Sequence, residues 1–227
     1  MQETSFVIPL WADLTAVAIG GVQGAVYAAQ FRDRRLDLLG VAIIGIASGL
    51  GGGLVRDIFL GRIPVALTDN WYVPAAVVAA LLGMLLERVF TRLATVVTVL
   101  DALTIGLFCA IGASKALALG LPAIPAIFLG TISAVGGTIV RDLLLSVPIA
   151  FMHVGSLYAV AAGVGATTLV VLHGVGVPIF LAAIICVAVT FGVRVLAVFF
   201  NWTVPEQRRL EQIPRLPRLR RNRPEPH

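Results

Sequence analysis

The sequence is poor in charged residues. Of its 227 residues only 13% are Asp, Glu, Lys or Arg, whereas 59% are hydrophobic, and the mean hydropathy is +0.98. A soluble domain usually carries about 45–50% apolar and roughly 25% charged residues. The shortage of charge excludes a disordered chain and an ordinary soluble enzyme. We therefore expect an integral membrane protein with little mass outside the bilayer.

Cysteine and catalytic motifs are scarce too. The two cysteines, Cys109 and Cys186, lie in apolar runs without CxxC spacing, which excludes a disulfide scaffold and predicts buried thiols. The sequence contains no HExxH, GxSxG or Walker motif, and His153 and His173 have no partner at metal-ligand spacing. We expect no enzymatic activity, metal site or cofactor. The N-terminus lacks a basic n-region, so we expect no cleavable signal.

Long apolar segments make up most of the chain. A helix that spans a bilayer needs about 20 mostly apolar residues. The runs are continuously apolar rather than alternating, which disfavours a β-barrel. The sequence thus predicts an all-α integral membrane protein with seven transmembrane helices, at about 13–31, 38–61, 72–90, 94–118, 122–146, 149–172 and 176–200.

Basic residues between these spans gather on one side of the membrane. If the spans alternate in direction, the segments after the first, third and seventh spans face the same side, and the positive-inside rule makes that side cytoplasmic. We expect the N-terminal residues 1–12 outside and the tail, 201–227, inside. The tail has a net charge of +4, from seven Arg and three Glu, and we expect it to bind anionic lipid headgroups rather than nucleic acid. The basic loop residues are Arg32, Arg34, Arg35, Arg88 and Arg92.

An internal repeat organises the chain. The segment GIASGLGGGLVRD at 45–57 matches GTISAVGGTIVRD at 130–142 at a constant offset of 85 residues, which pairs Ser48 with Ser133. The first three spans (13–91) therefore correspond to the next three (92–174), and the seventh (175–200) stands alone. Because three is odd, the two repeats enter the membrane from opposite sides, as in inverted-repeat membrane proteins.

Glycines of the repeat lie near the middle of the second and fifth spans. Glycine weakens a helix by about 1 kcal/mol relative to alanine, so a run of glycines favours a kink or a break. Non-helical backbone at membrane depth is tolerated where it is buried in protein or lines a water-filled path. Close helix packing through small residues is the alternative. The glycines in question are Gly51, Gly52, Gly53, Gly136 and Gly137.

We single out six charged residues that lie within the expected spans and away from the basic loops, where a charge costs about 2.5–3.5 kcal/mol at the centre of the bilayer. At about 1.5 Å per residue they fall at two depths. They either pair across helices or, with Ser48 and Ser133, line a polar conduit; the two interpretations are compatible. Lys115, the only lysine of the chain, is the best candidate for a gating charge. The outer set is Arg56, Asp57 and Lys115, which sums to +1, and the cytoplasmic set is Asp101, Arg141 and Asp142.

Taken together, these motifs resemble the prokaryotic TRIC (trimeric intracellular cation) channels, whose repeat is sometimes labelled a glycine-transporter domain. The resemblance covers roughly residues 13–200 and rests on the doubled Gly-rich stretch that ends in Arg-Asp. Further matches are the segments DLLG at 37–40, DALTIGLF at 101–108 and IGASKALA at 111–118.

The resemblance implies a homotrimer in the inner membrane of a bacterium or archaeon, with a pore for K⁺ and Na⁺ in each subunit. It implies that the second and fifth spans kink at their glycines and line the pore, and that Lys115 is the family's basic residue. The third glycine of the second motif is Thr138 here, which leaves the shape of the second kink open. A secondary transporter of a small solute such as glycine, and a membrane protein without a conduit, remain the alternatives.

Overall fold

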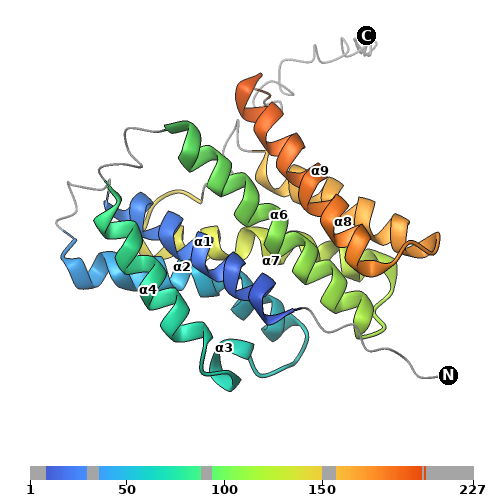
Figure 1. Ribbon diagram of the computed structural model, residues 1–227, viewed down its shortest axis with the longest axis horizontal. Helices are drawn as coiled ribbons and strands as arrows, with labels where there is room; N and C mark the ends of the chain where they lie inside the picture. The colour runs from blue at the N-terminus through green and yellow to red at the C-terminus, as the bar shows by residue number, and fades with distance from the viewer. Residues whose placement is uncertain (1–8, 30–35, 88–93, 150–156, 201, 203–227) are drawn as a thin grey trace, which may run out of the picture.

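The computed structural model describes residues 9–29, 36–87, 94–149, 157–200 and 202 (Figure 1). All regular elements in this part of the chain are helices. The basic loop residues, most of the Arg-rich tail and His153 lie outside it. The helices are α1 (Leu10–Ala29), α2 (Leu38–Phe59), α3 (Val65–Thr68), α4 (Tyr72–Leu85), α6 (Ala94–Ala118), α7 (Ala123–Leu144), α8 (Tyr158–Gly174) and α9 (Ile179–Phe199).

Four of these helices, α2, α6, α7 and α9, are long and apolar enough to cross a membrane. Two shorter apolar helices, α4 and α8, have 14 and 17 described residues, and α1 has 20 residues that include a buried Asp13. The all-helical membrane fold is thereby confirmed. A total of seven spans stays a prediction.

The repeat predicted from the sequence is present in the helix boundaries. Helix α2 runs from 38 to 59 and α7 from 123 to 144, so both ends keep the offset of 85 residues. The equivalence extends past the helices, because Gly61 and Ser146 both have positive φ, 64° and 47°. The backbone N–H groups of Arg62 and Val147 then donate to the carbonyls of Asp57 and Asp142, both at 3.0 Å. Each helix thus ends in the same capped turn.

Packing follows the repeats. Helices α1, α2 and α4 contact one another, as do α6, α7 and α8, and α9 packs on α6 and α8. Figure 1 shows the first group on one side, α8 and α9 on the other, and α6 and α7 between them. The predicted buried thiols are confirmed: Cys109 and Cys186 are free and fully buried between α6 and α9, with their sulfurs 3.8 Å apart.

The two repeats meet where α2 crosses α7, and the motif glycines lie at this crossing. A Cβ atom at Gly52 would lie 2.6 Å from the carbonyl oxygen of Ser133, and one at Gly137 would lie 2.4 Å from that of Ser48. Both helices continue through their glycines without interruption. Neither helix is therefore broken at these glycines, and a kink stays a prediction. Close packing, the alternative interpretation, explains why glycine is needed at Gly52 and Gly137.

Candidate functional site

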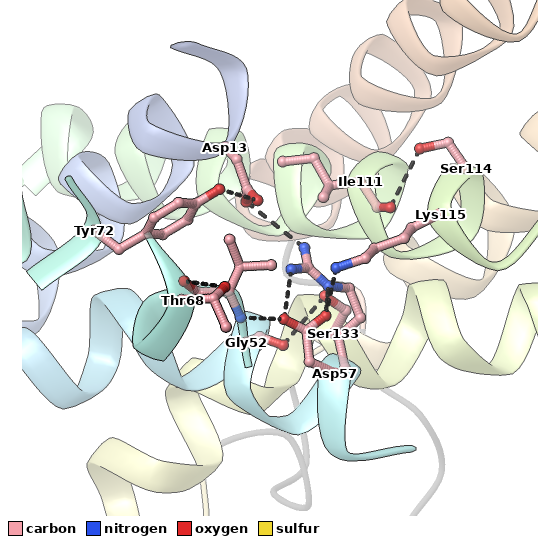
Figure 2. Close-up of polar contacts among 11 residues, drawn as sticks. Asp13, Gly52, Asp57, Thr68, Tyr72, Ile111, Ser114, Lys115 and Ser133 are labelled. Atoms are coloured by element: carbon pink, nitrogen blue, oxygen red, sulfur yellow. Dashed lines mark hydrogen bonds and ion pairs between the residues drawn. The ribbon is translucent and has the colours of Figure 1, made fainter. Parts of the chain in front are cut away.

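The ends of four helices bring buried charges together at one end of the helix bundle. Arg56 and Asp57, adjacent on the last turn of α2, form a two-pronged ion pair, with Nε–Oδ1 at 2.8 Å and Nη2–Oδ2 at 3.2 Å. Lys115, near the end of α6, places Nζ 2.7 Å from Asp57 Oδ1. Figure 2 shows the Lys115 side chain pointing at Asp57. With Asp13 and Tyr72, these residues form what we call the Lys115 cluster.

Asp13 and Tyr72 complete this cluster. The Tyr72 hydroxyl donates to Asp13 Oδ2 at 2.8 Å, and Asp13 Oδ1 lies 3.6 Å from Arg56 Nη1 (Figure 2). The expected net charge of +1 is therefore wrong, because Asp13 adds a second carboxylate and makes the cluster neutral. The first expected span begins at about residue 13 and Asp13 was not among the expected intramembrane charges, but α1 begins three residues earlier. An Asp in the first turn of a membrane helix was the available signal.

The Lys115 cluster is closed in this structure. The side chains of Arg56 and Asp57 are each only 1% exposed, whereas that of Lys115 is 20% exposed. The adjoining cavity, lined by Gly53 and Leu54 among others, has a volume of ≈ 10 Å³. A single water molecule needs about 10–15 Å³. This cavity is therefore too small to hold a hydrated ion.

A second group of charges joins α9 to both repeats. Arg194 of α9 donates to Asp101 Oδ2 through Nε at 3.3 Å and Nη2 at 3.2 Å, and its guanidinium lies 3.8 Å above the ring of Tyr158. Gln23 of α1 donates to the other oxygen of Asp101. We call these four residues the Arg194 cluster. Sequence analysis included Asp101 but missed Gln23 and Arg194, although an arginine six positions before the end of an apolar span was a usable signal.

The second Arg-Asp pair repeats the first with a different neighbour. Arg141 Nε and Nη2 lie 2.9 and 2.8 Å from Asp142 Oδ1, and the guanidinium stacks 3.8 Å above the ring of Tyr27. Both members are buried. Tyr27, near the end of α1, thus contacts the second pair from the other repeat, as Lys115, near the end of α6, contacts the first.

These contacts show that the two repeats are inverted. The Lys115 cluster joins the start of α1, the end of α2 and the start of α4. The equivalent ends of α6 and α7 carry Asp101 and Arg141, and these contact α1 near its other end, through Gln23 and Tyr27. Asp13 and Tyr27 are 14 residues apart, about 21 Å along a helix. The predicted separation of the charges into two depths agrees with this arrangement.

The remaining motif residues lie on α2 and α7. Ser133 Oγ donates to the carbonyl oxygen of Gly52 at 3.4 Å, and Ser48 is buried at the equivalent place. A Cβ atom at Gly53 would have Arg56 Nη2, a side-chain atom of the same helix, as its nearest neighbour at 3.7 Å, an ordinary contact distance. The third motif position therefore has room for a side chain, which explains Thr138 at the equivalent position.

The fold and the clusters define an all-helical membrane protein of two inverted three-helix repeats, with buried ion pairs at both ends. The family model described as "Glycine transporter" matches residues 10–88 and 98–174, which are the two repeats. The chain belongs to this family.

The chain is similar in sequence to bacterial proteins that are named as membrane proteins. A "UPF0126 membrane protein" of Deinococcus radiodurans is 34% identical over 158 residues, which cover 69% of this chain and 72% of the relative. The "UPF0126 inner membrane protein YadS" of Escherichia coli K12 is 29% identical over 199 residues, 86% of this chain and 94% of the relative.

Solved structures extend the similarity to channels. A structure reported as "Structural basis for conductance through TRIC cation channels" has a TM-score of 0.78 and is 28% identical in sequence. The match covers 88% of this chain and 98% of the solved chain. The TRIC trimeric intracellular cation channel orthologue from Rhodobacter sphaeroides has a TM-score of 0.77 and 29% identity, over 85% and 98%. The resemblance to prokaryotic TRIC channels is confirmed.

Proposed function

We propose that this protein is a channel for the monovalent cations K⁺ and Na⁺, assembled as a homotrimer with a pore in each subunit. The observation that carries the proposal is the similarity to TRIC cation channels across 98% of their length, at 28–29% identity. The secondary transporter is the weaker alternative, since only the family description favours it.

The proposed pathway runs along α2 and α7 between the two charged ends. Helices α2 and α7 carry both Arg-Asp pairs at their last turns, so an ion that follows them meets a buried carboxylate at each end of the bundle. Charged groups inside a membrane are rare and typically mark ion pathways. Lys115 bridges to one of these carboxylates, so we propose that it blocks the pore and moves when the pore opens.

The proposed orientation places the Lys115 cluster toward the outside and the Arg194 cluster toward the cytoplasm. This follows from the basic segments after the first, third and seventh expected spans. We propose the bacterial or archaeal inner membrane as the location, with the Arg-rich tail on anionic lipid. No cofactor enters the proposal.

Recording of the purified protein in planar bilayers tests the function. We expect discrete, ohmic current steps carried by K⁺ and Na⁺, because a pore conducts down the gradient without saturable turnover. Saturable uptake of a labelled small solute into vesicles, without current steps, would establish the transporter instead. Cross-linking in detergent should yield a trimer, and a monomeric protein that conducts would remove the homotrimer from the proposal.

A further inference from the structure

The carboxylate of Asp57 is held in place by groups that do not depend on Lys115. Arg56, its neighbour in the chain, donates to both carboxylate oxygens, and the backbone N–H of Val65 donates to Oδ2 at 2.9 Å. Asp57 itself is 1% exposed. The carboxylate therefore keeps its position and orientation when the lysine moves away.

Lys115 is the most exposed of the charged residues in the cluster. It comes from the second repeat, whereas the other four residues belong to the first, and its side chain is 20% exposed. A lysine ammonium is a compact charge on a flexible four-carbon stem. Of the groups bound to Asp57, the ammonium is therefore the one that can leave without unfolding a helix end.

The departure of Lys115 changes the charge of the cluster. With the ammonium in place, two carboxylates face two cations; without it, Asp13 and Asp57 face only Arg56, which leaves a net charge of −1. The vacated position lies 2.7 Å from a buried carboxylate oxygen. Desolvation strengthens the attraction of such a carboxylate for a cation, because the local dielectric constant is well below that of water.

We propose that this position beside Asp57 Oδ1 is a binding site for a permeant monovalent cation, which competes with the Lys115 ammonium. The inference rests on the channel function proposed above. In the closed state the ammonium is the built-in occupant, and in the open state a K⁺ or Na⁺ ion replaces it. The ion takes one ligand from Asp57 Oδ1 and completes its coordination with water. The neighbouring Arg56 guanidinium disfavours a divalent ion through repulsion.

Competition at one site makes gating depend on the concentration of the ion at this end of the protein. In single-channel recordings at fixed voltage, K⁺ on the Lys115 side is raised tenfold, with N-methyl-D-glucamine holding ionic strength constant. We expect the ratio of open to closed time to rise by up to tenfold in the wild type and to stay constant in Lys115→Ala. The same change of K⁺ on the opposite side is the control. The proposal is overturned if the ratio of open to closed time does not change with K⁺ concentration in the wild type, or if it changes equally in Lys115→Ala.

Thermal unfolding in detergent tests the same site without any current. In Lys115→Ala the site is vacant, so K⁺ at ten times its Kd should raise Tm by roughly 3–6 °C relative to N-methyl-D-glucamine. The wild type and the double variant Lys115→Ala/Asp57→Asn should show no such rise. Lys115→Gln replaces Lys115→Ala if the latter folds poorly. Equal Tm values in both ions for the vacant-site variant would refute the site. An absence of any cation current with a preserved Tm rise would instead refute the channel function alone.

Discussion

The α2–α7 crossing depends on the absence of single carbon atoms. A Cβ at Gly52 or Gly137 would meet a backbone oxygen at 2.6 or 2.4 Å, whereas one at Gly53 has its nearest neighbour at 3.7 Å. Backbone cannot move aside as a flexible side chain can, so the first two positions require glycine and the third does not. The two glycines thus allow the backbones of α2 and α7 to approach closely.

Alanine substitutions separate these positions. We expect Gly52→Ala and Gly137→Ala each to lower the free energy of unfolding by about 1–3 kcal/mol, the usual cost of an overpacked site. Gly53→Ala is the matched control, and should keep or raise stability because alanine favours helix by about 1 kcal/mol. Thermal unfolding in detergent measures all three. Similar losses at all three positions would show that the glycines act through helix flexibility instead.

Lys115 offers a test of gating at the same scale. Lys115→Ala removes the bridge to Asp57 and should raise the open probability, while Lys115→Arg should keep the bridge and change only the opening and closing rates. The side-chain swing crosses a fraction of the membrane field, worth about 2.3 kcal/mol per full charge at 100 mV, so voltage dependence should be shallow. Wild-type gating in a thermally destabilised Lys115→Ala would make the bridge purely structural.

The bounds of the helices could be predicted from the sequence better than the contacts between their charged side chains. The repeat predicts the bounds of α2 and α7 to within two residues at each end, because the length of each apolar run and the Arg-Asp pair that ends it can both be read from the sequence. The sequence also gives the depth of each charge along its helix. It does not give the direction in which a side chain points around the helix axis, and this direction decides pairing. Asp13 and Arg194 were therefore missed as partners, since a charge near a helix end is equally compatible with the membrane surface.

Helix α9 is attached to the repeats through the Arg194–Asp101 pair. Removing one member of a buried pair leaves an uncompensated charge and costs about 3–5 kcal/mol, whereas an apolar pair in its place is often tolerated. We expect Arg194→Met and Asp101→Leu to destabilise strongly when made singly, and the double variant to be more stable than the sum of the two losses predicts, by about 0.5–3 kcal/mol. Additive losses in the unfolding measurements would mean that the two side chains do not depend on each other.

At the scale of the whole molecule, inversion places equivalent helix ends on opposite faces. The start of α1 and the end of α2 meet at the Lys115 cluster, while the start of α6 and the end of α7 approach the other end of α1. Lys115, the only lysine of the chain, lies at one of these two ends and has no lysine counterpart at the other. We therefore expect the two entrances of the pore to differ in their response to ions, although their helices are related.

Membrane orientation is testable at two sites. A cysteine introduced at the exposed Thr68, between α2 and α4, should react with an impermeant maleimide added to intact cells. One introduced in the tail, at Gln212, should react only after the membrane is opened, because the basic segments hold it in the cytoplasm. Protection of Thr68→Cys together with labelling of Gln212→Cys in intact cells would reverse the proposed orientation.

The buried thiols have a practical consequence for such chemistry. Cys109 and Cys186 are 0% exposed and lie in the core between α6 and α9, out of reach of water-borne electrophiles. The native chain should therefore give a blank background in labelling experiments. Fluorophores or spin labels can then be attached at chosen positions without first replacing either native cysteine, which leaves the packing of α9 undisturbed.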